Sequence, residues 1–315
     1  MQHGISFDVE CYRQIHWNKF LGTSCDLSPD VERSTHLILD ALCESGTKAT
    51  FFIVGNVARR FPNVVRRIQA EGHELGTHGN EHRDVRDLDE PRFRDEVARG
   101  RDAIQEVVGE FVVAHRAPMF SIVSRSCFAL QTLRDLGFFY DSSIFPFRGT
   151  RYGDPSSPPA IHQLANGLWE VPLSVVGLWG RSVPALGGGY VRHAPLSFSR
   201  WAMGRREATN QPAVSYFHPW EFSLDPLTPR LTEFLSAPQA CLRLMWFNLS
   251  RHPGRGPRML AKLVGLLRAY EFVPLRTLVN AQAEVVARAQ KLRSASAGLR
   301  GESTARRASL TDAQP

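Results

Sequence analysis

Long apolar runs are missing from this sequence of 315 residues. A membrane-spanning helix requires roughly 18 consecutive apolar residues. The most apolar stretch, GLWEVPLSVVGLW, is interrupted by Glu170 and Pro172. Heptad repeats are also absent, which excludes a coiled coil. We therefore expect a soluble protein without a transmembrane segment.

Cysteine is scarce, and no two cysteines form a CxxC pair. The five residues are Cys11, Cys25, Cys43, Cys127 and Cys241. An odd number of widely spaced cysteines does not suggest a disulfide framework. A strand-like run, residues 5–9, begins so early that it leaves no room for the charged and apolar regions of a signal peptide. These two observations predict a cytoplasmic location.

A dense cluster of one charge is also lacking. The chain has 38 Lys and Arg against 31 Asp and Glu, a net charge of +7, and its arginine pairs are scattered. Nucleic-acid binding would need a basic face with a reading motif, so we expect no nucleic-acid partner. Peripheral contact with an anionic membrane surface stays open, because a modest positive charge raises encounter rates without specifying a partner.

What the sequence does contain is an alternation of strand-like and helix-like stretches. Strand-like runs occur at residues 5–8, 49–54, 74–77, 111–114, 214–217 and 272–275, and helical patterns separate them, including one predicted helix at 56–71. This order predicts an α/β fold, a barrel-like domain over residues 1–280 with a loop-rich insertion at about 145–190. The tail, 281–315, has few large apolar residues and is expected to be disordered at least from 295.

Polar residues with metal-binding potential follow two of these strands. Asp8 and Glu10 lie on one face of the first strand as D-V-E, because strand side chains alternate. His78 and His82, in THGNEH, have the i,i+4 spacing that lets two imidazoles meet if the segment turns helically. Two imidazoles and a carboxylate suit zinc or a similar divalent ion. Each pattern alone is also compatible with an ordinary polar strand end.

Two further strands end in residues suited to hydrolysis. Arg116, in HRAPMF, can hold a carboxylate through paired hydrogen bonds, and the N–H of Met119 follows a proline turn. His218, in FHPWEF, can donate a proton, while Trp220 offers a flat surface to a sugar ring. A surface arginine and a histidine beside a core tryptophan are the alternative interpretations.

The four motifs FDVE, THGNEH, HRAP and FHPWEF, in this order, resemble the motif series of the NodB-type polysaccharide deacetylases, carbohydrate esterase family 4. WEVP, FHPWEF and RMLAKLVGLLRAYEFVPL further resemble the subgroup linked to exosortase-associated exopolysaccharide systems. The resemblance covers roughly residues 4–280. It implies a distorted (β/α) barrel and a divalent metal, with Zn²⁺ as the first candidate. It also implies removal of N-acetyl groups from the N-acetylhexosamine units of a glycan substrate.

The resemblance also implies roles for individual residues. Asp8 corresponds to the general base, Arg116 to the residue that orients it, and His218 to the general acid. The N–H of Met119 would stabilise the oxyanion, and Trp220 would contact the substrate.

The metal ligands implied are His78, His82 and Glu10. Here the sequence departs from the family, because a valine stands where the second of two adjacent aspartates is usual, so the choice between Glu10 and Asp8 as ligand stays open. Glu170, in WEVP, is a candidate for a carboxylate that holds the arginine or the general acid from behind.

Two other functions use the same residues. A related metal-dependent amidohydrolase would act on a small amide substrate in a short, closed pocket. A non-catalytic glycan-binding module would retain the sugar site without turnover. The sequence does not identify the glycan, the natural metal or the oligomeric state.

Overall fold

The computed structural model describes residues 1–21, 26–123, 126, 128–149, 152–223, 228–251 and 253–291. The chain divides into two units, Met1–Leu278 and Val279–Pro315. In the second unit residues 279–291 are helical. The disorder expected from residue 295 concerns residues outside the described part. Among the described helices, none is long and apolar enough to span a bilayer.

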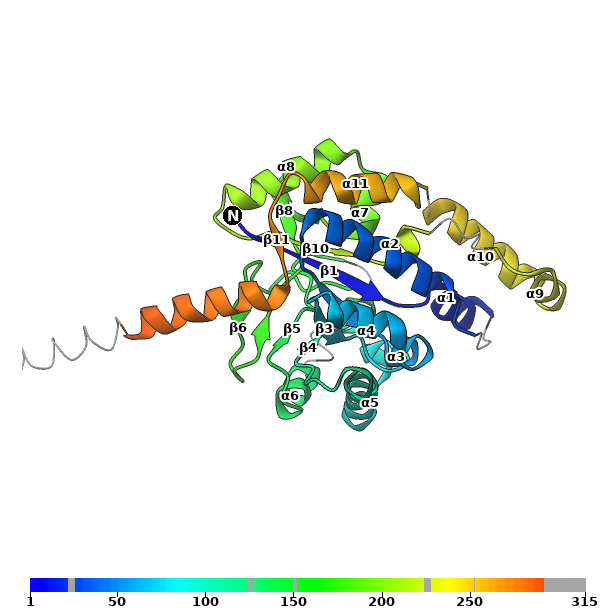
Figure 1. The fold of residues 1–315 in the computed structure, drawn as a ribbon, viewed down its shortest axis with the longest axis horizontal. Helices are drawn as coiled ribbons and strands as arrows, with labels where there is room; N and C mark the ends of the chain where they lie inside the picture. Colours follow the sequence, from blue (N-terminus) through cyan, green and yellow to red (C-terminus); the bar gives the residue numbers. More distant parts are fainter. Residues whose placement is uncertain are drawn as a thin grey trace, which may run out of the picture. The chain divides into compact units, whose positions relative to one another are not determined.

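The larger unit is built on a curled, mostly parallel sheet (Figure 1). Its strand order is β10 (Val214–Phe217), β1 (His3–Val9), β2 (Thr50–Ile53), β3 (Glu74–Thr77), β4 (Ala114–His115), β5 (Tyr140–Asp141), β7 (Trp169–Glu170) and β6 (His162–Gln163). Only the β6–β7 pair is antiparallel, and β11 (Phe272–Val273) also pairs with the start of β1. A separate antiparallel hairpin consists of β8 (Val175–Leu178) and β9 (Arg181–Pro184).

Backbone hydrogen bonds draw the two ends of the sheet together. The N–H of Ser174, just after β7, donates to the carbonyl of Val214 over 3.4 Å, and the N–H of Tyr216 donates to Leu186 over 3.4 Å. Gly187 forms an isolated parallel bridge with Tyr216. The segment that follows β7 is therefore bonded to β10, and the expected α/β fold with a distorted barrel is confirmed.

Helices surround this sheet in Figure 1. They are α1 (Tyr12–Leu21), α2 (Asp30–Ser45), α3 (Gly55–Arg60), α4 (Pro62–Ala70), α5 (Glu90–Val108), α6 (Phe128–Asp135), α7 (Gly188–His193), α8 (Leu196–Glu207), α9 (Leu231–Ser236), α10 (Pro238–Arg251) and α11 (Pro257–Leu267). The single helix predicted at 56–71 is wrong. Pro62 has no N–H to continue the helix that ends at Arg60, so it starts α4 instead.

The central strand β1 is buried on both faces, as expected for a strand between parallel neighbours. Ile5, Phe7 and Val9 belong to the main hydrophobic core, where the ring of Phe7 stacks on that of Phe51 at 5.1 Å. The alternate residues of β1 therefore point to the other face of the sheet. Asp8 is one of them, and its orientation is set by the same alternation that builds the core.

Candidate active site and metal centre

The candidate site lies where four parallel strands end. Because carboxyl ends of parallel strands meet at one edge of a barrel, β1, β3, β4 and β10 deliver their following residues to the same place. The residues that meet there, through contacts of 2.7 to 4.0 Å, are Asp8, Glu10, His78, His82, Arg116 and His218. The structure thus brings together six of the residues singled out in the sequence.

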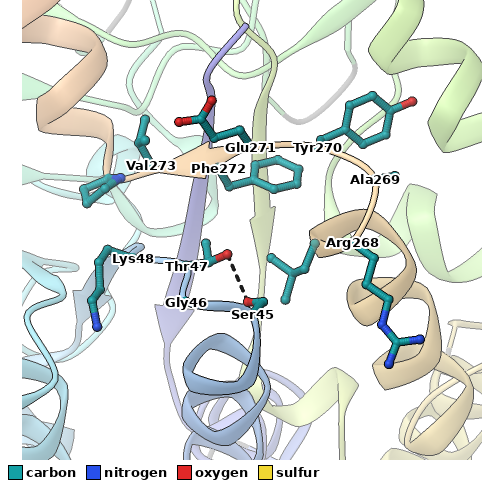
Figure 2. A pocket seen from close by; sticks show the side chains of 12 residues that line it. Ser45, Gly46, Thr47, Lys48, Arg268, Ala269, Tyr270, Glu271, Phe272 and Val273 are labelled. Atoms are coloured by element: carbon teal, nitrogen blue, oxygen red, sulfur yellow. Dashed lines mark hydrogen bonds between the residues drawn. The ribbon is translucent and has the colours of Figure 1, made fainter.

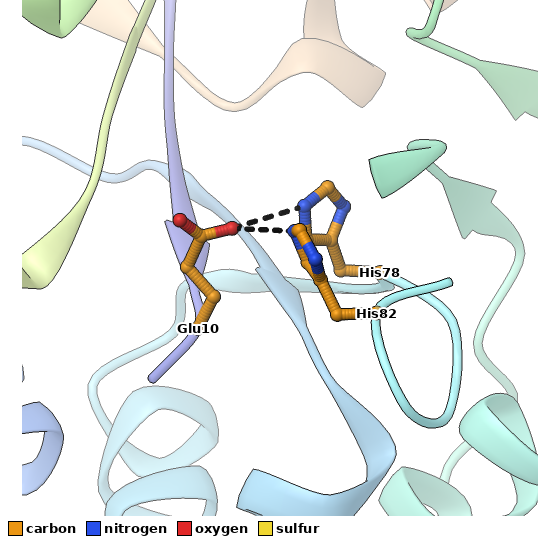
Figure 3. Close-up of side chains that lie close together, drawn as sticks. All are labelled: Glu10, His78 and His82. Carbon is orange, nitrogen blue, oxygen red and sulfur yellow. Dashed lines mark ion pairs between the residues drawn. The ribbon is translucent and has the colours of Figure 1, made fainter. Parts of the chain in front are cut away.

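Glu10, His78 and His82 form a compact cluster of ligand atoms (Figure 3). The Nε2 atoms of His82 and His78 lie 2.7 and 3.6 Å from Glu10 Oε2, and one ligand atom from each residue lies within 4.8 Å of the others. All three side chains are buried. Burial by itself would raise the pKa of Glu10, but the charges of His82 and His218 hold it well below its usual range.

The histidine tautomers fit a metal ligand set. His78 Nδ1 lies 2.8 Å from the backbone carbonyl of Arg116, which can only accept, so Nδ1 carries the proton and Nε2 keeps its lone pair. Burial also lowers the pKa of His78, which favours this neutral form. His82 Nε2 is buried, and among the described residues its one polar contact is the ion pair with Glu10 Oε2 at 2.7 Å. Two imidazole nitrogens and one carboxylate are a known catalytic zinc set, with room for further ligands.

The His78–His82 loop is not the helical turn that the spacing suggested. Residues 78–84 contain no helix, and the two rings meet at 5.0 Å with planes inclined by 65°. Instead, Gly79 and His82 adopt left-handed backbone conformations, with φ of 75° and 60°. The i,i+4 spacing therefore correctly predicted that the two imidazoles converge, but a loop, and not a helical turn, brings them together.

The loop is held by a residue that the sequence analysis missed. Glu96, on the buried face of α5, accepts hydrogen bonds from the N–H groups of Asn80 and Glu81, at 2.9 and 2.6 Å. Gly100, on the same helix, lets the loop approach, because a Cβ there would come within 2.5 Å of the Gly79 carbonyl. A carboxylate at a core-facing helix position was the available signal.

Arg116 fixes the Asp8 carboxylate in a dry environment. Its Nη1 donates to Asp8 Oδ1 over 2.7 Å and to Ser6 Oγ over 2.8 Å. Nε and Nη2 donate to the carbonyl and the hydroxyl of Ser142, at 2.9 and 2.8 Å. The guanidinium also lies 4.3 Å from the ring centroid of Phe52 and is fully buried. The guanidinium therefore pairs with the Asp8 carboxylate and orients it through Oδ1.

His218 stands between the two carboxylates. Its Nε2 lies 4.0 Å from Asp8 Oδ2 and 3.9 Å from Glu10 Oε1, while Nδ1 lies 3.4 Å from Glu221 Oε2. Arg192 binds the other oxygen of Glu221 at 2.5 Å. Burial would lower the pKa of His218, but the three carboxylates raise it to about 9. Glu221 and Arg192 were not singled out in the sequence, although Glu221 lies inside FHPWEF.

Trp220 contacts two residues of the site. Trp220 Nε1 donates to Glu10 Oε1 over 3.3 Å, and its ring stacks on His218 at 5.4 Å with Arg192 at 5.0 Å. Trp220 thus orients a candidate ligand in addition to any contact with substrate. Met119 has a left-handed φ of 55° and its side chain is exposed.

Glu170 is buried and contacts the backbone that follows β5. Its Oε1 accepts from the N–H of Ile144 over 3.0 Å, and no hydrogen bond among the described residues joins it to Arg116 or His218. Burial and the nearby Asp141 carboxylate raise its pKa well above the usual range. The charge of Arg116 also acts on the Glu170 carboxylate, so its role as a carboxylate that holds the arginine or the general acid stays a prediction.

A hollow of about 610 Å³ lies at the other end of the sheet (Figure 2). It is lined by residues 45–48 and 267–274, next to the start of β1 and β2, with Lys48 and Arg268 on opposite sides. Neither range contains a histidine or a cysteine. This hollow shares no residue with the candidate site, so its size does not make it the catalytic centre.

Comparison with known proteins agrees with this geometry. Residues 19–140 match the family model for polysaccharide deacetylase, and residues 142–280 match a domain of unknown function, DUF3473. The chain is 37% identical over 84 residues to the peptidoglycan-N-acetylglucosamine deacetylase of Bacillus cereus, covering 27% of this chain and 30% of that protein. It is 30% identical over 137 residues to a chitin deacetylase of Pestalotiopsis, covering 42% and 45%. The matches therefore span less than half of either relative.

A solved structure supports the fold. A candidate polysaccharide deacetylase from Mycobacterium smegmatis superposes with a TM-score of 0.53 and 20% sequence identity, over 86% of this chain and 91% of that one. The family model and the relatives named as deacetylases lead to one conclusion, with which the shared fold agrees: residues 19–140 belong to a polysaccharide deacetylase domain of the NodB type, carbohydrate esterase family 4.

Proposed function

We propose that this protein is a metal-dependent hydrolase that removes N-acetyl groups from N-acetylhexosamine units of a polysaccharide. The observation that carries the proposal is the buried Glu10–His78–His82 cluster with His218 Nε2 3.9 Å from its carboxylate. The same histidine nitrogen lies 4.0 Å from Asp8, so a ligand set, a base and an acid share one small volume. Such a set suits attack of water on an amide carbonyl.

Glu10, His78 and His82 would hold the metal, and Zn²⁺ is the ion that this donor set favours. A divalent ion supplies positive charge that polarises the acetyl carbonyl and acidifies water. Asp8, held by Arg116, accepts the proton of the attacking water. Because the ion pair fixes one carboxylate oxygen, the other is the one available for proton transfer.

His218 donates the second proton. The neighbouring carboxylates raise its pKa to about 9, so the ring is protonated at neutral pH. Its Nε2 faces the site and its Nδ1 is held by Glu221, which leaves Nε2 to protonate the departing sugar amine. The backbone N–H of Met119 is our candidate donor to the oxyanion on the acetyl carbon, and acetate and a free amine are the products.

The two other functions predict different properties. A non-catalytic glycan-binding module has no need of a complete set of base, acid and ligands, and all of these side chains are present and converge. An amidohydrolase for a small substrate would favour short amides over glycans. We also propose a role in exopolysaccharide biosynthesis, because the DUF3473 match falls on the segment with the subgroup-like stretches. The cytoplasmic location stays a prediction from the sequence.

Acetate release from a panel of N-acetylglucosamine oligomers, lipid-linked glycans and short amides tests the proposal. We expect release from the glycans, loss of activity after dialysis against a chelator, and recovery with Zn²⁺. Metal content is measured on the same samples. Release from short amides alone would favour the amidohydrolase, and binding of oligomers without release would favour the glycan-binding module.

The role of His218 predicts a contrast between substrates. His218→Ala should lower turnover of N-acetyl sugars by about 10²- to 10⁴-fold, because the amine cannot leave without a proton. An activated aryl acetate, whose leaving group departs unprotonated, should lose much less. Both rates are measured on one preparation whose metal content is unchanged. Equal losses on the two substrates would assign His218 to oxyanion stabilisation or to packing against Trp220.

A further inference from the structure

Two helices next to the site present an apolar surface to solvent. On α10 the exposed residues are Leu242, Met245, Trp246 and Leu249, at the i, i+3, i+4 and i+7 positions of a single helix face. They are between 40% and 76% exposed. On α9, Leu231 and Leu235 are each 74% exposed, four residues apart. We call these six side chains the hairpin surface.

The hairpin surface is separate from the face of α10 that packs against the rest of the protein. The opposite side of α10 is packed, since Cys241 and Leu244 are fully buried and Leu244 clusters with Tyr12 and Trp17 of α1. The ring of Phe247 also contacts Phe20 of α1 at 5.2 Å. α10 is therefore apolar on two faces, of which one builds the protein interior and the other faces water (Figure 1 shows α9 and α10 extending beyond the neighbouring helices). An exposed apolar patch of this kind marks an interaction site.

The charges around the hairpin surface indicate its partner. Among the residues whose side chains the structure describes, α1, α9 and α10 with the preceding Arg230 contain one acidic residue, Glu233, against four cations: Arg13, Lys19, Arg230 and Arg243. The acid is already bound to Arg13 at 2.5 Å. Leu, Met and Trp on one face with a cationic surround are the composition of helices that lie in a membrane interface. In a symmetric contact between two copies of this chain, two positively charged surfaces would face each other. Their repulsion opposes such a contact.

We propose that the hairpin surface docks on an anionic lipid bilayer, with the apolar side chains in the headgroup region and the cations over the lipid phosphates. The surface is connected to the candidate site. Asn248 of α10 bonds the Tyr12 hydroxyl at 2.5 Å, and Tyr12 contacts the ring of Trp220 at 5.0 Å. A pocket of about 200 Å³ is lined by Glu10 and Trp220 of the site and also by Arg230. Docking would therefore bring a residue that lines this pocket, Arg230, to the membrane surface.

Co-sedimentation of the full chain with vesicles tests this proposal without any reference to turnover, so its outcome is independent of the proposed deacetylase activity. We expect binding to vesicles of phosphatidylglycerol and phosphatidylcholine, at least about tenfold weaker binding to phosphatidylcholine alone, and weakening with salt. The triple variant Leu242→Ser, Trp246→Ser, Leu249→Ser should bind at least about 100-fold more weakly, because three large apolar side chains no longer enter the interface.

Two further variants keep the result interpretable. Trp179→Ser removes another exposed tryptophan, 91% exposed at the turn between β8 and β9, and should leave vesicle binding unchanged. Arg243→Glu should weaken binding to the anionic vesicles and leave the thermal melting temperature unchanged. Absence of vesicle binding by the wild-type chain, or equal binding by the triple variant, would overturn the proposal. So would a dimer in light scattering that the triple variant abolishes while vesicles stay unbound.

Discussion

His78→Ala and His82→Ala should each lose bound metal and with it all measurable acetate release. Each substitution removes one of the three ligand atoms that lie within 4.8 Å of one another in the described part of the chain, and a catalytic ion needs at least three protein ligands to stay bound with an open position. Metal content by mass spectrometry after dialysis and turnover on N-acetylglucosamine oligomers are the two measurements.

His162→Ala is the matched control, because His162 lies on β6 outside the cluster and bonds only the carbonyl of Ala160 among the described residues. Its metal content and turnover should equal those of the wild type. Wild-type protein and both cluster variants carrying the same amount of metal would show that the ion, if any, binds elsewhere.

The second large effect is expected for Asp8→Asn, which should keep the metal and lose turnover by about 10²- to 10⁴-fold. Asparagine preserves the shape and one acceptor for Arg116, but it cannot take a proton. The arginine is fully buried and loses its counter-charge, so we also expect stability to fall, by about 3–5 kcal/mol if the charge stays unpaired. Turnover must therefore be compared well below the melting temperature of the variant.

Glu10→Gln separates the two acids. It should lose metal, because Glu10 contributes the carboxylate oxygen nearest to both imidazoles. Equal loss of metal from Asp8→Asn and Glu10→Gln would mean that Asp8 is also a ligand, and the division of labour between base and ligand would have to be redrawn.

Residues whose position follows from strand periodicity could be predicted from the sequence. Asp8 and Glu10 share one side of D-V-E, and Arg116 and His218 follow buried strands whose carboxyl ends meet at one sheet edge. Strand order need not be known for this argument, because every parallel strand delivers its end to the same edge. The residues of the candidate site could therefore be predicted without knowledge of the strand order.

Residues whose role depends on a distant partner could not be predicted. Glu96, on α5, holds the His78–His82 loop, and Arg192 holds Glu221, which lies 29 positions away in the sequence. A single sequence does not report such pairs, because any buried carboxylate has many cationic candidates. The left-handed φ of His82 was equally hidden, since helical spacing and a loop can produce the same convergence.

Arg116 serves both halves of the site by different chemical means. Its side chain binds Asp8, but the group that fixes the tautomer of His78 is its backbone carbonyl, at 2.8 Å. Every amino acid has that carbonyl, whereas only arginine has the guanidinium. A substitution at position 116 therefore removes the guanidinium that orients the base Asp8 but keeps the carbonyl that holds the ligand His78, so the base can be disturbed while this contact to the metal ligand remains.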